Sequence, residues 1–342
     1  MYFVRKKRNA TRKIVWQFFT AILLILAIGG AAYAQQAPIV LRYSHNQKTG
    51  HPYDIGAQKF AELVAQKTGG KIKIDVYPNS VLGVSTQVVD AVRMGTVDFI
   101  VEHTATFEGY EKGLGVFGVP GLYSSWDQFW SAVDGDIGKE FEEKLEKKGF
   151  KVLGWQRNGW YHIITNKRVQ KPSDLKGFKF RGKPGAIMGT ITDKMYGTVT
   201  VSVDYSELYS ALQLGLVNGM VQNVTNIRDT TIYEAAPYIL LAGPLYATNL
   251  LVVSMKTYQK LPKEFQEALL EAGHEASLYE RKVSEEYEQR DLEWLKNNPK
   301  VFVTELSPEE KAEWDAAFKN AEDFVYQYFG KDMIDRIKAL KK

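Results

Sequence analysis

The apolar residues of this chain recur with two alternating periods, and this alternation restricts the fold more than any other feature of the sequence. Three stretches have the alternating or short apolar pattern of strands: Ile39–Tyr43, Lys71–Tyr77 and Thr96–Val101. Between them, apolar residues at three- and four-residue spacing predict helices over Ile55–Val64 and Val88–Met94. The order strand, helix, strand, helix, strand indicates a βαβ sheet covered by helices.

A second set of alternating strands and helices follows. Its strands are expected at Lys151–Trp155, Trp160–Thr165, Lys179–Arg181, Thr198–Val203, Asn218–Val221 and Leu250–Ser254. Its helices are expected around Ile187–Met195 and Tyr205–Leu214. Two such blocks without a low-complexity linker predict an α/β fold of two lobes, joined by short crossings.

The C-terminal third of the chain is predicted to be helical. From Pro262 to about Leu295 there is no further proline and one glycine, Gly273. About thirty residues at ~1.5 Å each make a rod of roughly 50 Å, which is long enough to brace both lobes. A coiled coil is the alternative, but a strict heptad is not kept by Phe265, Leu269, Leu278 and Tyr287. One or two amphipathic helices are expected within residues 308–340.

The first thirty-four residues have the three-part layout of a secretory signal peptide. Six basic residues and no acidic one precede an apolar run from Ile14 to about Ile28. Ala32 and Ala34 then take the small-residue positions of an A-x-A site, so cleavage after Ala34 and a periplasmic product are expected. An uncleaved membrane anchor is the alternative, although the run is shorter than the ~20 residues that a span needs.

Charge and cysteine content exclude several kinds of protein. The chain has 44 Lys and Arg against 40 Asp and Glu, and removal of the six bases in residues 1–34 leaves 38 against 40. This small negative excess gives no electrostatic support for nucleic-acid binding. The chain contains no cysteine, which excludes disulfides, thiolate catalysis, thiolate zinc ligands and an N-terminal lipid anchor on cysteine. The exported product therefore depends on its hydrophobic core for stability.

No catalytic or metal-binding motif is present in the sequence. The five histidines form neither an H-E-x-x-H pair nor a close triplet, and there is no G-x-S-x-G elbow, phosphate loop or dinucleotide fingerprint. We therefore predict no catalytic residue, no metal and no cofactor. Two alternatives stay open: an exported α/β enzyme, and a metal ion that bridges a ligand carboxylate to Glu102 or Glu207.

Polar and aromatic residues gather at predicted strand ends, where open α/β sheets bind ligands. They are Glu102, His103, Trp160, Tyr161, Arg181, Tyr205 and Gln222. The pivotal residue is Arg181, because a guanidinium stays charged and its planar fork matches the two oxygens of a carboxylate. Its alternatives are an ordinary surface position or a pair with an acid such as Asp174. For the aromatics the alternative is a place in the core, and for Glu102 and His103 a solvated loop.

Collinear motifs extend over nearly the whole mature chain. They are FAELV (Phe60–Val64), KTGGKIKIDVYPNSVLG (Lys67–Gly83), GTVDF (Gly95–Phe99), VPGLY (Val119–Tyr123), TNKRVQKPSDLKGFKFR (Thr165–Arg181), SELYSALQLGLVNG (Ser206–Gly219) and LPKEFQEAL (Leu261–Leu269). Together they resemble the solute receptors of tripartite ATP-independent periplasmic (TRAP) transporters, the DctP-like family.

The resemblance implies a two-lobed periplasmic-binding-protein-like fold, type II-like, that closes on a ligand. A long helix, expected at residues 262–296, crosses both lobes. The first lobe is expected to take residues 38–158 and about 246–285, and the second 159–245 and about 286–340. The implied function is that of a monomeric extracytoplasmic receptor that binds a small organic acid and delivers it to TRAP permease subunits. A receptor for an ATP-driven importer or a sensor kinase is the alternative.

The resemblance also implies roles for single residues. Arg181 matches the family's arginine that clamps the substrate carboxylate, and Tyr205 matches an aromatic that packs on the ligand. Gln222 stands where an asparagine that bonds the ligand is usual. Glu102 and His103 match a loop that lines the cleft.

Three departures from the family pattern bear on the ligand. Tyr161 stands where many members have a second cleft arginine, Val221-Gln222-Asn223 replaces an acidic-Asn-Pro run, and a roomier Gly182-Lys183-Pro184-Gly185 follows Arg181. Arg157 is a candidate for the replacement cation. An uncharged Tyr161 favours a monocarboxylate with an apolar or aromatic body over sialic acid or a C4-dicarboxylate.

Overall fold

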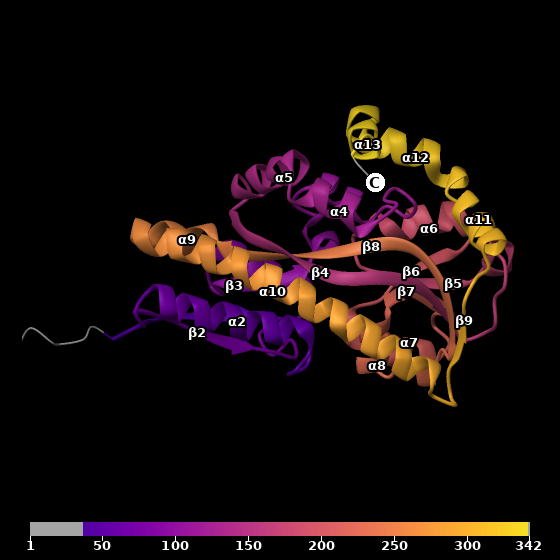
Figure 1. Cartoon of the computed structure of the whole chain (residues 1–342), viewed down its shortest axis with the longest axis horizontal. Helices are drawn as coiled ribbons and strands as arrows, with labels where there is room; N and C mark the ends of the chain where they lie inside the picture. The colour runs from indigo at the N-terminus through magenta and orange to yellow at the C-terminus, as the bar shows by residue number, and fades with distance from the viewer. Residues whose placement is uncertain (1–36, 341–342) are drawn as a thin grey trace, which may run out of the picture. The chain divides into compact units, whose positions relative to one another are not determined.

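The structure is a computed structural model and describes residues 37–340 (Figure 1). The expected signal peptide, residues 1–34, lies outside the described residues. Within the described part, one mixed sheet of nine strands has the order β2-β1-β3-β8-β4-β7-β5-β6, and β9 pairs with β8. No helix within residues 37–340 combines the length and the apolar character needed to cross a bilayer.

The first half of the sheet consists of β1, β2 and β3 and confirms the predicted βαβ pattern. Strands β1 and β3 pair in parallel. The half contains β1 (Ile39–Ser44), α2 (Pro52–Lys67), β2 (Ile72–Tyr77), α3 (Ser85–Met94) and β3 (Phe99–His103). Strand β3 ends two residues later than predicted, so Glu102 and His103 lie within the strand and not in a loop after it.

The second half of the sheet consists of β5, β6 and β7. Strand β5 pairs in parallel with both β6 and β7. The half contains η3 (Pro172–Leu175), β5 (Lys179–Gly182), α6 (Met188–Tyr196), β6 (Val199–Ser202), η4 (Tyr205–Glu207), α7 (Leu208–Gln213), β7 (Gly219–Asn223), α8 (Val224–Asp229) and η5 (Ile232–Glu234). Its strands lie where the sequence places them, although β7 extends to include Gln222.

The two halves are joined by a central pair of long antiparallel strands, β4 (Phe150–Thr165) and β8 (Tyr238–Ser254). The prediction of short crossings is therefore wrong, as is the division of β4 into two strands. The polar run from Gln156 to Asn158 interrupts the apolar pattern, yet these residues are buried within the strand. The pairing of β4 with β8 shifts register at several points, one of them between Arg157 and Gly159, and β4 continues as one strand across these irregularities.

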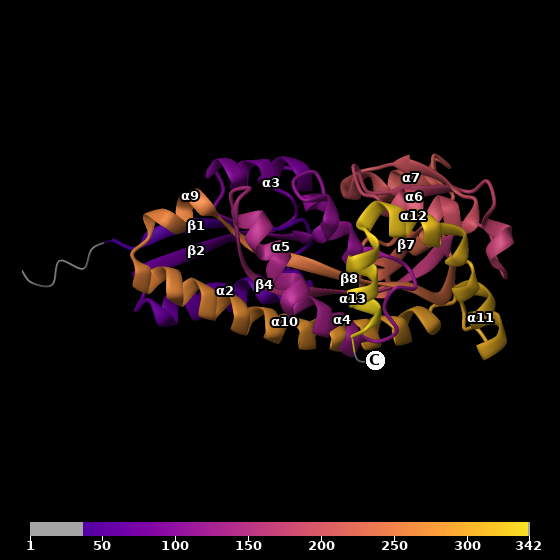
Figure 2. The ribbon, with the colours of Figure 1, turned by 90° about the horizontal axis from the view of Figure 1, so that it is seen from above.

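A single helix of 34 residues, α10 (Lys263–Lys296), confirms the predicted rod. It contacts α2 beside the first half of the sheet, β4 in the centre and α8 beside the second half, as Figures 1 and 2 show. Buried acids attach it to the sheet and to α8: Glu280 accepts a 2.8 Å hydrogen bond from the Arg157 backbone N–H, and Asp291 pairs with Arg228 at 2.5 Å.

Several elements were not predicted. Between β3 and β4 lie η1 (Thr104–Phe107), η2 (Lys112–Gly118), α4 (Trp126–Val133) and α5 (Asp136–Glu146), and α9 (Met255–Lys260) precedes α10. After α10 come β9 (Phe302–Thr304) and three helices where one or two were expected: α11 (Pro308–Ala316), α12 (Lys319–Phe329) and α13 (Lys331–Lys338).

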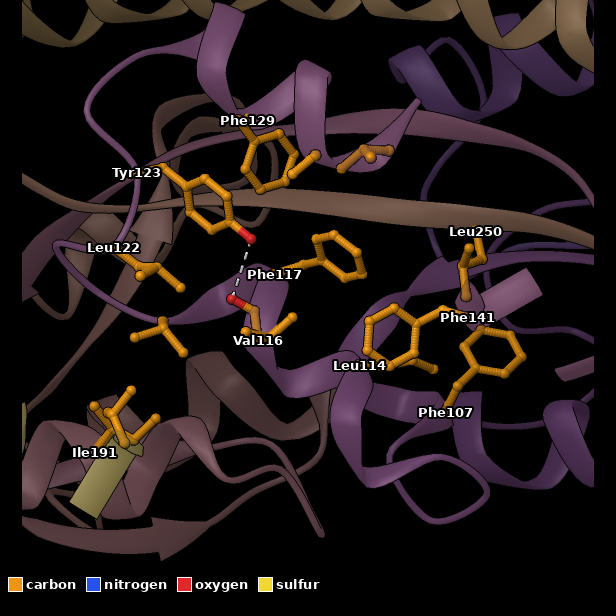
Figure 3. Close-up of a cluster of buried hydrophobic side chains, with 14 of the residues drawn as sticks. Phe107, Leu114, Val116, Phe117, Leu122, Tyr123, Phe129, Phe141, Ile191 and Leu250 are labelled. Atoms are coloured by element: carbon orange, nitrogen blue, oxygen red, sulfur yellow. Dashed lines mark hydrogen bonds between the residues drawn. The ribbon is translucent and has the colours of Figure 1, made fainter. Parts of the chain in front are cut away.

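The largest hydrophobic cluster packs aromatic rings from η1, η2, α4 and α5 against the central strands (Figure 3). Phe117 is fully buried, and its ring meets Phe141 at 5.4 Å and Trp155 at 5.0 Å in edge-to-face geometry. Two further clusters lie beside it, one around Phe60 under α2 and α10 and one around Ile227 in the second half. Within residues 37–340, three hydrophobic clusters therefore stabilise this cysteine-free protein.

We predict that Phe117→Ala lowers the free energy of unfolding by about 3–5 kcal/mol, because it removes a buried ring and leaves a cavity. Leu214 is 82% exposed, so Leu214→Ala is the control and changes stability by less than about 0.5 kcal/mol. Chemical denaturation of both variants measures the effect. Equal losses in the two variants contradict the assignment of Phe117 to the core.

Candidate functional site

A cavity is lined by residues from both halves of the sheet and from the central strands. The first half contributes His103 and Glu108, the second half Arg181, Lys183 and Met188, and the central strands Tyr161 and Leu245. Its empty volume is about 670 Å³, part of it open to solvent.

Arg181 presents a free cationic end to this cavity. It lies on β5, and its Nε donates a 2.9 Å hydrogen bond to the carbonyl of Val203. Within residues 37–340, its two terminal nitrogens make no hydrogen bond or ion pair. Asp174 is not its partner, because that carboxylate accepts the backbone N–H groups of Gln170 and Lys171. Burial lowers the pKa of Arg181, yet a guanidinium stays charged at working pH.

Lys183 is a second cation in the cavity wall. Its Nζ lies 3.0 Å from Glu102 Oε1 and 3.3 Å from the Thr106 hydroxyl. Burial lowers the pKa of Lys183, and the negative charge of Glu102 opposes this. Lys183 was not predicted as a site residue. The sequence feature that could have identified Lys183 is its position two residues after Arg181, because residues two apart in an extended segment point to the same face.

Glu102 and His103 are buried neighbours at the end of β3. Glu102 Oε2 accepts a hydrogen bond from Asn46 at 3.1 Å, while Oε1 faces Lys183. His103 lines the cavity, and its Nδ1 accepts the N–H of Ala105 at 2.9 Å. Burial, together with the nearby Lys183 and Arg181, places the pKa of His103 well below its ordinary value. The His103 ring is therefore neutral at physiological pH.

Tyr161 lines the cavity, and its hydroxyl donates to Asn158 Oδ1 at 3.1 Å. Burial raises the pKa of Tyr161, so the phenol stays neutral. Tyr205 and Gln222 are not among the residues that line the cavity. The Tyr205 hydroxyl donates to Gln47 at 3.0 Å, and Gln222 Oε1 accepts the Asn223 N–H at 3.0 Å.

Trp160 and Arg157 lie outside the cavity lining. Successive residues of a strand point to opposite faces, so Trp160 and Tyr161 point away from each other. The Trp160 indole N–H donates to the Gly243 carbonyl at 2.9 Å. A side chain on Gly243 would come within 2.1 Å of that ring, and its φ of +55° also favours glycine. Arg157 pairs with Glu288 at 3.1 Å, so it is not free to replace the missing arginine.

Glu108 lines the cavity and was also missed. Its Oε2 accepts the backbone N–H of Ile187 at 2.8 Å, a contact between the two halves of the sheet. Burial raises the pKa of Glu108 to about 7. Glu108 was not predicted because nothing in the sequence distinguishes it from the other acidic residues nearby.

Polar contacts join elements of the two halves of the sheet. His51 Nε2 lies 3.0 Å from Asn226 Oδ1, and Lys48 pairs with Asp229 at 2.9 Å. The Lys183 pair with Glu102 adds a third contact of the same kind. The cavity has two cations, Arg181 and Lys183, in its wall, and this arrangement is suited to hold a small anion.

Comparisons with known proteins agree with this geometry. The DctP family model, bacterial extracellular solute-binding protein family 7, matches residues 43–328. The 2,3-diketo-L-gulonate-binding periplasmic protein YiaO of Escherichia coli is 28% identical over 84% of this chain and 88% of its own length. The C4-dicarboxylate-binding periplasmic protein DctP of Rhodobacter capsulatus is 27% identical over 96% and 98%.

The solved structures include a TRAP periplasmic solute-binding protein from Sulfurospirillum deleyianum with bound succinate. It has a TM-score of 0.83 and 28% identity, and the match covers 90% of this chain and 100% of that chain. The α/β, two-lobed periplasmic-binding-protein-like fold predicted from the sequence is thereby confirmed.

We predict that Glu108→Gln gains stability over the wild type as the pH rises. The folded wild type keeps the Glu108 proton up to a pKa of about 7, whereas the unfolded chain releases it near the ordinary value of 4.5. Rising pH therefore destabilises the wild type across this window, and glutamine has no proton to lose. Denaturation curves of both proteins from pH 4 to pH 8 give the difference. A difference that is constant over this range contradicts the pKa of Glu108.

Proposed function

The chain belongs to family 7 of the bacterial extracellular solute-binding proteins, the DctP family, and we propose that it is a periplasmic receptor that captures a small organic acid and delivers it to TRAP permease subunits. The observation that carries this proposal is the free end of Arg181 in the cavity wall. The receptor acts as a monomer, without metal or cofactor and without covalent chemistry.

Arg181 favours a carboxylate for a physical reason. Its Nε is held by the Val203 carbonyl, so the guanidinium plane is oriented before a ligand arrives. The remaining fork of two N–H groups matches a carboxylate in two parallel hydrogen bonds. In a cavity with few waters the ion pair is stronger than an exposed one, because the local dielectric is lower. The relatives named above as binding 2,3-diketo-L-gulonate, C4-dicarboxylates or succinate bind acids of this class.

The rest of the cavity wall suits the body of such an acid. Phe180, Met188, Val221 and Leu245 provide apolar surface, and the neutral Tyr161 closes the side where many relatives have an arginine. Of the other predicted ligand contacts, His103 lines the cavity, while Tyr205 and Gln222 do not line it and are bonded to Gln47 and Asn223. Trp160 is not proposed as a contact, because its indole is bonded to Gly243.

We assign capture to closure of two lobes about the central strands. The first lobe takes residues 38–158 and about 246–285, and the second 159–245 and about 286–340, with α10 as a brace across both. In the open form the acid enters, and Arg181 binds its carboxylate. Closure then forms the contacts between His51 and Asn226 and between Glu108 and Ile187. Residues 1–34 direct export and are removed after Ala34.

A thermal-shift screen of organic acids on the mature receptor tests this proposal. We predict that at least one carboxylic acid raises the melting temperature, and that Arg181→Ala weakens its binding by at least about 30-fold. Removal of one partner of a buried charge pair costs about 2–5 kcal/mol, which corresponds to that factor or more.

Arg168→Ala is the matched control, because Arg168 is an exposed arginine of the same half. It is expected to bind the acid as the wild type does. If the same acid stabilises the wild type and Arg181→Ala equally, Arg181 is not the carboxylate site and the proposal fails.

A further inference from the structure

Beside Arg181, the pair of Lys183 and Glu102 adds a second charged element to the cavity wall. Given the proposed function, the geometry points to this pair as the determinant of ligand charge: Glu102 neutralises Lys183, so the receptor accepts an acid with one negative charge and discriminates against dicarboxylates.

Lys183 is placed to contact the ligand. It follows β5 directly and lies two residues after Arg181, and both residues line the cavity. Its side chain is 20% exposed, whereas that of Glu102 is 2% exposed. The ammonium group thus lies between the cavity and the buried carboxylate, 3.0 Å from Glu102 Oε1.

Glu102 is a fixed partner for this lysine. Its Oε1 also accepts the His103 backbone N–H at 2.9 Å and the Thr106 hydroxyl at 3.3 Å. Its Oε2 accepts the Asn46 amide at 3.1 Å. Three hydrogen bonds from its own half of the sheet hold the carboxylate in place. The second carboxylate of a dianion would therefore compete for Lys183 with Glu102 Oε1, which these hydrogen bonds hold in place.

The charges in the wall favour a monoanion. Arg181 and Lys183 contribute two positive charges and Glu102 one negative charge, which leaves one positive charge for the ligand. The His103 ring is neutral, and Glu108 adds no charge while it keeps its proton, which burial holds up to a pKa of about 7. A monoanion brings the wall to neutrality. A dianion leaves one uncompensated negative charge in a site largely withdrawn from water, which is unfavourable.

Succinate and succinamate test this inference, because they have nearly the same shape and differ by one negative charge. We predict that the wild type prefers succinamate and that Glu102→Gln, which frees Lys183, lowers the ratio of the succinate Kd to the succinamate Kd by about tenfold or more. Isothermal titration calorimetry on the mature receptor gives both constants. If Glu102→Gln binds succinate no more tightly than the wild type does, the inference is overturned, including the case in which neither binds it.

Two further variants make the test specific. Adding Lys183→Met to Glu102→Gln removes the freed cation, so the gain in succinate binding is lost; a gain that persists overturns the inference.

If Glu102→Gln does not fold, Lys183→Met alone serves, because it leaves Glu102 uncompensated beside Arg181. Its succinamate Kd is predicted to rise about tenfold or more, and an unchanged Kd overturns the inference. The Arg181→Ala experiment is independent, so it separates failure of this inference from failure of the proposed function.

Discussion

A guanidinium that is held at one nitrogen and free at the other two is the constraint on which the rest of the site depends. Val203 fixes the Nε of Arg181, and no acid in residues 37–340 pairs with its free end. Nearby Glu102 is already bound to Lys183, and Asp174 to backbone N–H groups. A buried cation without a partner is unfavourable, so the cavity favours an anion from solution.

The frame around this cation is held by polar side chains as well as by the hydrophobic clusters. The Tyr161 hydroxyl in the cavity wall donates to Asn158, which also receives the Asn223 amide at 2.8 Å and donates to Asn249 at 2.8 Å. Asn249 accepts the Tyr53 hydroxyl from α2 at 3.0 Å. These bonds connect the cavity wall to β4, β7, β8 and α2, where the central strands join the two halves of the sheet. Buried networks of this kind favour one arrangement of the backbone, which keeps the wall in position.

The sequence predicted the elements whose burial has a regular period, and it missed those that depend on tertiary context. Helix α10 and the short parallel strands follow from apolar spacing alone. Strand β4 was divided because Gln156, Arg157 and Asn158 are polar, and only their buried partners explain their place in a strand. For the site, Arg181 was predicted because a guanidinium at a strand end matches a carboxylate and because the family resemblance implies that role; its place in the cavity lining agrees with this, and ligand contact stays a prediction. Glu108 and Lys183 depend on contacts between residues about 80 positions apart, which no local pattern contains.

A crystal structure of the receptor with a bound acid is the most direct test of carboxylate binding by Arg181. We expect a carboxylate within hydrogen-bond distance of both terminal nitrogens of Arg181, with Nε still donating to the Val203 carbonyl and the body of the acid against Tyr161 and Met188. An acid bound elsewhere, or an Arg181 side chain turned toward an internal acid or bulk water, would contradict it.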